Sequence, residues 1–428
     1  MKRIPDSMQQ LSAHLRVRLG DRSKLADMFE QCMLNTWNTT IHQSLDGTTF
    51  VITGDIPAMW LRDSAAQVRP FLTLAGDDEE IAGMIEGLIA RQFAYIDHDA
   101  YANAFNEEEN GQGHQNDLTA MSPWIWERKY EIDSLCYPIQ LSYLLWKNTG
   151  RTSQFNQTFI AGVKRIIELW TLEQNHESDS GYRFQRLDGA LTDTLPRDGK
   201  GSLTSYTGMT WSGFRPSDDA CKYGYLIPAN MFAVVVLRYV CEIARDVLGD
   251  SEMEKSAQVL AGQIDEGIRR YGIVQHPEFG AVYAYEVDGL GGVNLMDDAN
   301  VPSLLSIPYL GYVSAEDVVY QNTRRLILSQ ANPYYYTGKA AAGIGSPHTP
   351  DHYIWPIALA VQGMTSLDEK EQEALIELLE KTDAGTGFMH EGFHADEPGE
   401  YTRPWFSWAN MMFCELLLMH CGIRVKTN

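Results

Sequence analysis

The sequence predicts an all-α fold built as one large domain. Apolar residues recur at helical spacing along most of the chain, and the few short β signals do not alternate with the helices, which excludes a doubly wound α/β sheet. The 428 residues include no linker rich in Ser, Gly or Pro and no low-complexity tract. Because large helical domains of this length occur as single units, we expect one domain over residues 1–428.

Two apolar stripes show the helical period most clearly. They consist of Leu25, Met28, Phe29, Cys32 and Met33, and then of Ile81, Met84, Ile85, Leu88 and Ile89. Further helices are predicted over 128–147, 152–173, 218–246, 252–271, 315–329, 352–364, 368–382 and 405–422. Short β segments are predicted at 48–54, 181–186 and 280–287, and we expect them to form small hairpins on loops.

Composition limits the classes of partner. Acidic residues outnumber basic ones by 57 to 34, which gives a formal net charge of −23. Such a chain repels phosphate backbones and anionic lipid surfaces, so nucleic acid and membranes are not expected as partners. The 44% of hydrophobic and 11% of aromatic residues predict a well-packed core instead of disorder.

The cysteines and the N-terminal sequence predict a cytoplasmic location. The six cysteines are scattered, form no CxxC pair, and mostly lie in apolar helical runs, which favours buried free thiols in a reducing compartment. The first twenty residues lack the apolar segment of a signal peptide. No run of 18 apolar residues predicts a membrane span.

Five segments between the helices are rich in Trp, Tyr, Gly, Pro, His and single acids. They are 54–69, 110–133, 206–219, 343–355 and 385–407. Aromatic residues in loops indicate a lined pocket at one end of a helical scaffold. Flat aromatic faces beside carboxylates, amides and arginines suit the C–H faces and hydroxyls of a sugar, so chemistry alone favours a carbohydrate site.

A glycosidic bond is hydrolysed by two carboxyl groups, one of which protonates the leaving oxygen while the other activates water or attacks the sugar carbon. The candidates are Asp218 and Glu391. Asp218 precedes Asp219 and follows Ser217, a predicted N-cap, so both acids are expected in a first helical turn. There they would also simply complement the helix dipole. Glu391 lies in a glycine-flanked loop. The alternative interpretation is that it is a solvated loop acid without a catalytic role.

The same loop reads HEGFH from His390 to His394, a formal match to the zinc-peptidase signature. That signature requires both histidines on one face of a helix, and the neighbouring Gly387 and Gly392 disfavour a helix. The HTPDH segment at 348–352 is interrupted by Pro350. We therefore expect no metal site and no cofactor, and the zinc hydrolase remains an alternative.

In the segment DIPAMWLRDS, Arg62 precedes Asp63. Such a pair either holds a loop or grips two adjacent sugar hydroxyls with charge-assisted hydrogen bonds. The sequence contains no GxGxxG, no P-loop and no GxSxG segment, so nucleotide-binding and serine-hydrolase functions lose their main support.

Several long segments resemble glycoside hydrolase family 125. They are DIPAMWLRDSAAQVRPFL, WERKYEIDSLCYPIQL, FRPSDDACKYGYLIPANMFA, SPHTPDHYIWPIALA and TRPWFSWANMMFCELLL. They run from about residue 50 to the C-terminus, and they are most similar to bacterial members of streptococcal type. The resemblance implies an inverting, metal-independent exo-α-1,6-mannosidase. It also implies an (α/α) barrel of six helical hairpins, with small β hairpins at the active-site end.

The resemblance also implies roles for individual residues. The general acid is expected at Asp218, with Asp219 as the neighbouring alternative, and the general base at Glu391. Arg62 and Asp63 are expected to hold the terminal mannose of an oligosaccharide substrate. The full set expected to bind substrate is Trp60, Arg62, Asp63, His114, Gln115, Asn116, Arg215, Ser346, His348 and Arg403. Besides the zinc hydrolase, the alternatives are another (α/α)-barrel glycoside hydrolase, a sugar epimerase, and a carbohydrate-binding protein without turnover.

Overall fold

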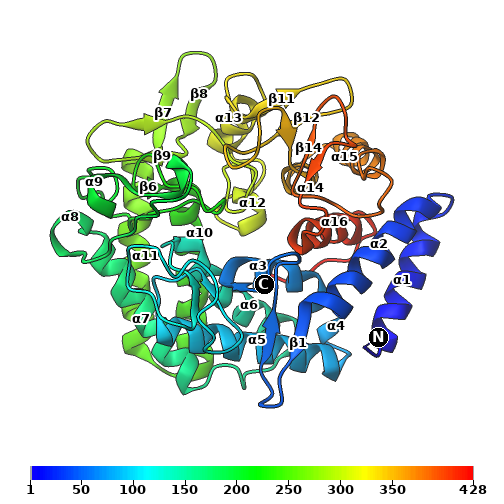
Figure 1. Ribbon diagram of the computed structural model, residues 1–428, viewed down its shortest axis with the longest axis horizontal. Helices are drawn as coiled ribbons and strands as arrows, with labels where there is room; N and C mark the ends of the chain where they lie inside the picture. The colour runs from blue at the N-terminus through cyan, green and yellow to red at the C-terminus, as the bar shows by residue number, and fades with distance from the viewer. Residues whose placement is uncertain (1, 428) are drawn as a thin grey trace.

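The computed structural model describes residues 2–427, so Met1 and Asn428 of the expected domain lie outside the described residues. Helices dominate the fold, as predicted (Figure 1). The longer ones are α1 (Asp6–Leu19), α2 (Ser23–Asn35), α3 (Leu61–Val68), α5 (Glu79–His98), α6 (Ile132–Thr149), α7 (Gln157–Glu173), α10 (Ile227–Ile243), α11 (Ser251–Tyr271), α13 (Val318–Ile327), α14 (Pro356–Met364), α15 (Glu369–Lys381) and α16 (Ser407–His420). Single turns form α4 (Leu72–Ala75), α8 (His176–Asp179), α9 (Pro196–Gly199) and α12 (Ile307–Leu310).

The helices form an inner and an outer layer. Helices α10, α14 and α16 are buried over nearly their whole length, because their sequences are mostly apolar. Every residue of α3 is buried as well, although it includes polar and charged side chains. The outer helices carry one apolar stripe, as in α11, where Met253, Leu260, Ile264 and Ile268 face inward. The inner helices pack on one another in the pairs α3–α6, α6–α10, α14–α16 and α16–α3.

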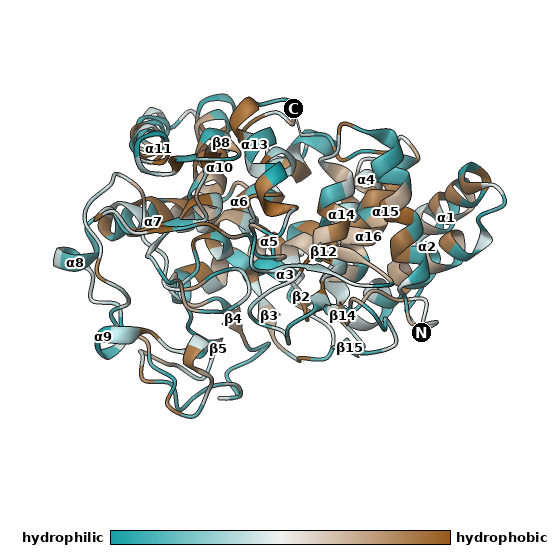
Figure 2. Cartoon of the chain, turned by 90° about the horizontal axis from the view of Figure 1, so that it is seen from above, coloured by the Kyte–Doolittle hydropathy of each residue, from teal (hydrophilic) through white to brown (hydrophobic). Residues whose placement is uncertain are grey.

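Small sheets and hairpins lead into the inner helices. The three-stranded sheets are β3–β4–β5 (Met59–Trp60, Ala104–Phe105, Ile125–Glu127), β10–β9–β6 (Val293–Asn294, Glu286–Val287, Tyr225–Leu226) and β13–β14–β15 (Tyr353–Ile354, Gly392–His394, Tyr401–Thr402). The hairpins are β1–β2 (Ile41–Gln43, Thr49–Val51), β7–β8 (Ile273–His276, Gly280–Tyr283) and β11–β12 (Tyr335–Thr337, Ala342–Ile344). Strand β3 runs directly into α3, and β6 into α10. Strands β3, β4, β5, β14 and β15 lie on one side of the fold, whereas β8 lies on the opposite side, beside α11 and α13 (Figure 2).

Two predicted elements differ in the structure. The helix predicted over 218–246 begins only at Ile227, with Pro228 in its first turn, because residues 214–220 form a turn closed by the Phe214–Ala220 bridge. Asp218 and Asp219 therefore lie outside the helix, and Ser217 is not its N-cap. The predicted β segment 181–186 contributes a single bridge, between Gln185 and Leu118.

One helical segment differs from the expectation that no apolar run is long enough to cross a membrane. Within residues 2–427, Ile227–Leu248 meets that criterion by length and composition, and 78% of its most apolar window is buried inside the fold. The segment begins with α10, which packs against α6 and α11. Burial among other helices accounts for its composition.

Candidate active site

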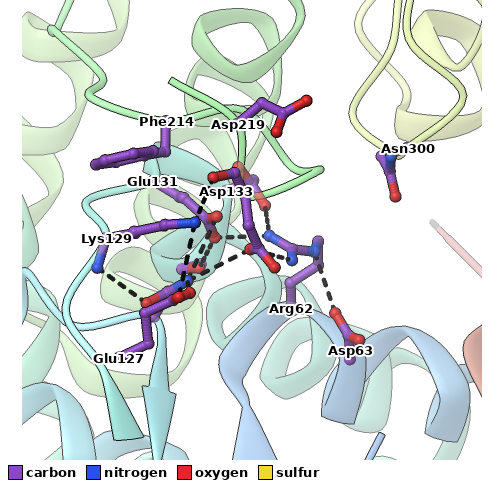
Figure 3. Close-up of polar contacts among 12 residues, drawn as sticks. Arg62, Asp63, Glu127, Lys129, Glu131, Asp133, Phe214, Asp219 and Asn300 are labelled. Carbon is purple, nitrogen blue, oxygen red and sulfur yellow. Dashed lines mark hydrogen bonds and ion pairs between the residues drawn. The ribbon is translucent and has the colours of Figure 1, made fainter. Parts of the chain in front are cut away.

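Four carboxyl groups surround the guanidinium of Arg62. Its Nη1 donates to Glu131 Oε2 at 2.6 Å and to Asp133 Oδ2 at 3.2 Å. Its Nε donates to Asp63 Oδ1 at 3.1 Å, and its Nη2 donates to Asp218 Oδ1 at 3.2 Å. Figure 3 shows Arg62 rising from α3 toward Glu131 and Asp133, with Asp63 beside it. One buried cation thus gathers acids from three separate segments.

The fold brings these acids together at the N-terminal ends of α3 and α6. Arg62 and Asp63 lie in the first turn of α3, Asp133 lies in the first turn of α6, and Glu131 is the N-cap residue of α6. Asp218 reaches them from the turn before α10, where its φ of 69° lies in the left-handed region. A non-glycine residue in that region costs free energy, and such strain is typical of functional sites.

Burial and charge act in opposite directions on the acids. Burial raises the pKa of Glu131 well above its ordinary value, although Arg62 opposes the rise. Burial likewise raises the pKa of Asp133, to about 6, against the effect of Arg62. For Asp218 the balance is reversed: burial would raise its pKa, but Arg62 and Lys129 hold it well below the usual range. The expected first helical turn would have placed Asp218 in the field of a helix dipole; in the structure, Arg62 and Lys129 act on it instead.

Lys129 and Asn103 complete this cluster. The Lys129 ammonium is buried, and its Nζ donates to the Asp218 carbonyl at 2.7 Å and to Asp193 Oδ1 at 2.8 Å. Asn103 Nδ2 lies 2.9 Å from Glu127 Oε1, 3.5 Å from Glu131 Oε1 and 3.4 Å from Asp218 Oδ1. The backbone and the side chain of Asp218 are therefore held by different partners.

Glu391 lies near Arg403, on the segment before α16. Its Oε1 is 3.6 Å from Arg403 Nη1, and its side chain is 8% exposed. Arg403 in turn donates to Asp55 and, at 2.8 Å, to Thr53 Oγ1. Its charge also acts on Asp63, so Arg403 connects the Glu391 segment with the Arg62 cluster.

His348 and Asp219 form a second acid–base pair at the site. His348 Nδ1 lies 3.2 Å from Asp219 Oδ1. Burial would lower the pKa of His348, but its hydrogen bond to Asp219 and the nearby carboxylates raise it to about 9. The other oxygen of Asp219 is buried and has no hydrogen-bond partner among residues 2–427, and Figure 3 shows this carboxyl group pointing away from Arg62.

Arg215 and Ser346 are less directly connected to the cluster. Arg215 Nε donates to Glu286 Oε1 at 2.6 Å, and its charge acts on the buried Asp298. Ser346 is buried, and its Oγ accepts the backbone N–H of His348 at 3.2 Å. Both residues thus hold the segments around His348 and Asp298.

The expected residues at 114–116 are not brought into the cluster. His114 is half-exposed and lies 3.8 Å from Glu127 Oε2. Gln115 donates its amide to backbone oxygens of its own loop, with 2.7 Å to Ile125 O, and Asn116 is exposed. Trp60 lies directly before α3, and its Nε1 is buried with no hydrogen-bond partner in the described part of the chain.

Sequence reasoning missed several residues of this site. Glu131, Asp133 and Lys129 contact the cluster, and Asn103, Asp298 and Asn300 are buried near it. The signal was present in WERKYEID, where several charges precede a strongly apolar helix. Charges at the buried end of such a helix require partners, which makes them candidates for a site.

The zinc alternative does not fit the local backbone. In HEGFH, Gly392–His394 is strand β14, not a helix. The His390 ring stacks on Tyr401, with 3.7 Å between ring centroids. An extended segment rises about 3.3 Å per residue, so the two histidines are not brought one helical turn apart as the signature requires.

The sequence model of a family described as metal-independent alpha-mannosidase (GH125) matches residues 22–418. The chain belongs to the GH125 family. It is therefore a metal-independent α-mannosidase and a glycoside hydrolase. This membership confirms the resemblance stated above and sets aside the epimerase, the zinc hydrolase and the binding protein without turnover.

Two relatives are similar over nearly the whole chain. A Streptococcus pneumoniae protein, solved as a non-productive substrate complex with alpha-1,6-mannobiose, is 52% identical, with 99% of this chain and 100% of that chain covered and a TM-score of 0.97. The meiotically up-regulated gene 157 protein of Schizosaccharomyces pombe is 43% identical over 96% of this chain and 85% of its own length.

The GH125 chain also shares its fold with more distant glycosidases. A bacterial glucoamylase complexed with acarbose is 14% identical, with 86% of this chain and 49% of that chain covered and a TM-score of 0.57. At this identity the likeness concerns the fold alone. Neighbours of this kind are (α/α)-barrel glycosidases.

Proposed function

We propose that this α-mannosidase is an inverting exo-enzyme that releases terminal α-1,6-linked mannose from oligosaccharides such as N-glycan fragments. The observation that supports it most is the similarity to the S. pneumoniae protein, which was solved with alpha-1,6-mannobiose. The buried cluster around Arg62 supports it independently, because carboxyl groups and a fixed guanidinium can bind the paired hydroxyls of a terminal sugar.

Asp218 is the proposed general acid and Glu391 the proposed general base. The side chain of Asp218 is 23% exposed, so it can reach a bound sugar while Arg62 Nη2 holds its Oδ1. In this role it protonates the leaving oxygen. Glu391 accepts a proton from the water that attacks the anomeric carbon, and its Oε1 lies 3.6 Å from Arg403 Nη1.

Substrate recognition is proposed for the remaining site residues. Asp63 contacts Arg62 and Arg403 contacts Glu391, which suits both residues to hold the mannose ring. Unpartnered buried polar atoms of Trp60, Ser217, Asp219 and Asp298 are available to sugar hydroxyls or water. His114 and Asn116 lie outside the cluster and suit contacts with a more distant sugar.

We also propose that the helices form an (α/α) barrel of six hairpins. The helix pairs α2/α3, α5/α6, α7/α10, α13/α14 and α15/α16 each combine one outer helix with the inner helix that follows it, and α11 with the single turn α12 is the proposed sixth pair. The buried inner helices and the packing of α3 on both α6 and α16 support a closed ring. We also propose a single domain in the cytoplasm, which the six unpaired cysteines support.

Proton NMR of the first product tests the stereochemistry. With α-1,6-mannobiose as substrate, we expect β-mannose to appear before mutarotation produces the α anomer. Two carboxyl groups that flank a water should lie about 6.5–9.5 Å apart, against about 5–5.5 Å in a retaining enzyme. Initial α-mannose, or a covalent mannosyl adduct on Glu391, would contradict inversion.

The acid is tested by comparing two leaving groups. Asp218→Asn should lower kcat on α-1,6-mannobiose by about 10²–10⁴-fold, because the sugar alcohol leaves only when protonated. On an aryl mannoside with an acidic leaving group, the loss should be much smaller. Asp219→Asn is the matched variant one residue away. If it shows the selective loss instead, the acid is Asp219, and equal losses on both substrates would remove Asp218 from the role.

A further inference from the structure

Arg62 and Asn103 hold the carboxyl groups of Glu131 and Asp218 beside each other. Arg62 donates to both, at 2.6 Å and 3.2 Å, and the single Asn103 Nδ2 atom lies within 3.5 Å of an oxygen of each. An ionised carboxylate only accepts hydrogen bonds, so a contact between two carboxyl groups requires a proton on one of them. Glu131 Oε2 is already occupied, since it accepts from Arg62 Nη1 at 2.6 Å and from Ser134 Oγ at 2.8 Å. Its Oε1 faces Asn103 Nδ2, which also lies 3.4 Å from Asp218 Oδ1.

Charge balance leads to the same requirement. Arg62 contacts four carboxyl groups, and the side chains of Glu131 and Asp133 are 0% exposed. One guanidinium leaves three negative charges uncompensated in a buried cluster. Lys129 contributes a second cation, but it is shared with Asp193 and Glu127. Like charges so close together cannot all remain ionised in a low-dielectric site.

We infer that Glu131 and Asp218 hold one proton between them, and that Glu131 is a positioning residue which supplies Asp218 with the proton that the leaving oxygen receives. This inference rests on the proposed function, in which Asp218 is the acid. It resolves a conflict at the site: Arg62 and Lys129 favour an ionised Asp218, whereas an acid must carry a proton. The carboxyl group of Glu131 keeps that proton within one hydrogen bond of Asp218.

Each turnover uses one proton of the Glu131–Asp218 pair and restores it. The bond between the anomeric carbon and the leaving oxygen breaks while Asp218 gives that oxygen a proton, and Asp218 receives the proton held by Glu131. Water forms the new bond to the anomeric carbon and loses a proton to Glu391. Release of that proton to solvent and uptake of one by the Glu131–Asp218 pair restore the enzyme.

Other charged and titratable groups also face the pair. They are Arg62 and Asp63 from α3, Asp133 from α6, Lys129 and Glu127 from the segment before α6, His348 from the segment before α14, and the Cys221 thiol. The proton therefore belongs to the coupled group, and the pH profile reports a value for the pair.

The pH dependence of kcat/KM in Glu131→Gln tests the inference. A glutamine amide still donates a hydrogen bond to Asp218 but carries no transferable proton. Asp218 must then bind its own proton beside Arg62 and Lys129. The alkaline limb of the profile should shift to lower pH by at least about one unit, with about 10²-fold lower kcat/KM on α-1,6-mannobiose at neutral pH. An aryl mannoside should lose less than about 10-fold.

Two further variants separate this role from a structural one. Glu131→Asp retains an ionisable group and should move the alkaline limb back toward that of the wild type. Asp133→Asn is the matched control, because it removes a carboxylate that contacts Arg62 but is not hydrogen-bonded to Asp218. The alkaline limb of its pH profile should shift by less than that of Glu131→Gln. In an infrared difference spectrum, Glu131→Gln should lose one carbonyl stretch of a protonated carboxyl group.

The outcomes are distinguishable. A wild-type protein that releases no mannose contradicts the proposed function itself. If the wild type releases mannose and Glu131→Gln folds with an unshifted alkaline limb, or loses equal activity on both substrates, the inference about Glu131 is wrong. An equal shift in Asp133→Asn would also overturn it, since the total charge of the cluster would then explain the effect.

Discussion

Two buried arginines lie about two helical turns apart in the segment that begins at Leu61, and their counter-charges differ. Arg62 contacts the four carboxyl groups of Asp63, Glu131, Asp133 and Asp218. Arg69 has one, Glu415, with 3.3 Å between Arg69 Nε and Glu415 Oε1, and its guanidinium lies over the Tyr309 ring at 4.3 Å from the centroid. Arg62 therefore contacts more carboxyl groups than one guanidinium can neutralise, whereas Arg69 does not.

This difference separates a functional cluster from a structural pair. One arginine with one glutamate is neutral, and the Tyr309 hydroxyl satisfies the second oxygen of Glu415 at 2.8 Å, so Arg69 simply joins α3 to α16. An arginine with four acids leaves buried negative charge, which costs stability. Groups with strongly shifted pKa values in such surroundings are candidates for catalysis.

The largest expected effect is that of Arg62→Ala. Without the guanidinium, Asp218 loses the cation that orients it and the sugar loses a charged donor. We expect kcat/KM on α-1,6-mannobiose to fall by about 10³-fold, with KM raised and kcat lowered together. Steady-state kinetics on the folded protein measure both parameters.

Arg62→Lys serves as the control for charge alone. An ammonium retains the charge but cannot match four carboxyl groups with a planar guanidinium, so activity should recover only in part. Near wild-type kinetics in Arg62→Ala would show that the acid excess at this end has no catalytic role, and the contrast with Arg69 would disappear.

Arg69→Met is expected to affect stability and not catalysis. Removal of one member of a buried pair leaves Glu415 uncompensated, which should lower the free energy of unfolding by about 3 kcal/mol. The kcat of the folded protein should stay within about twofold, because Arg69 follows the C-terminal end of α3, about 10 Å along the helix axis from Arg62, and contacts none of the proposed catalytic groups. Urea denaturation and steady-state kinetics on the same sample measure the two quantities.

The double variant Arg69→Met with Glu415→Gln isolates the charge. It removes both ions and retains an acceptor for the Tyr309 hydroxyl, so most of the lost stability should return. A large fall in kcat with unchanged stability in Arg69→Met would mean that the two arginines are not functionally distinct.

Much of this contrast could be predicted from sequence. Helical periodicity correctly located most outer and inner helices, and the aromatic-rich segments 54–69, 206–219 and 385–407 do supply Arg62, Asp218 and Glu391. The family was identified from blocks that the GH125 match over 22–418 confirms. These features are local patterns, and local patterns are what a sequence displays directly.

The contents of the cluster could not be predicted, because they depend on how distant segments meet. Glu131 and Asp133 appear as ordinary N-terminal charges of α6 until α3 brings Arg62 within 3.2 Å of both. Asp218 was assigned to a first helical turn because Ser217 resembles an N-cap. The turn with φ of 69° at Asp218 depends on the Lys129 contact and the Phe214–Ala220 bridge, which are tertiary.

The smallest expected effect concerns a pair whose charge can be switched by pH. His348 and Asp219 form an ion pair only while the imidazole is protonated, and the pKa of His348 is raised from 6.5 to about 9 by Asp219, against the effect of burial. A group with a raised folded-state pKa contributes stability that is complete below the unfolded pKa and is lost as the pH rises toward the folded one. The His348 side chain is 35% exposed, so solvent screening limits the contribution to about 1 kcal/mol.

We therefore expect the unfolding free energy of the wild type to fall by that amount between pH 6.5 and 9, relative to His348→Gln. Urea denaturation of both proteins at several pH values measures it. Parallel curves for the two proteins would show that Asp219 does not hold a protonated imidazole.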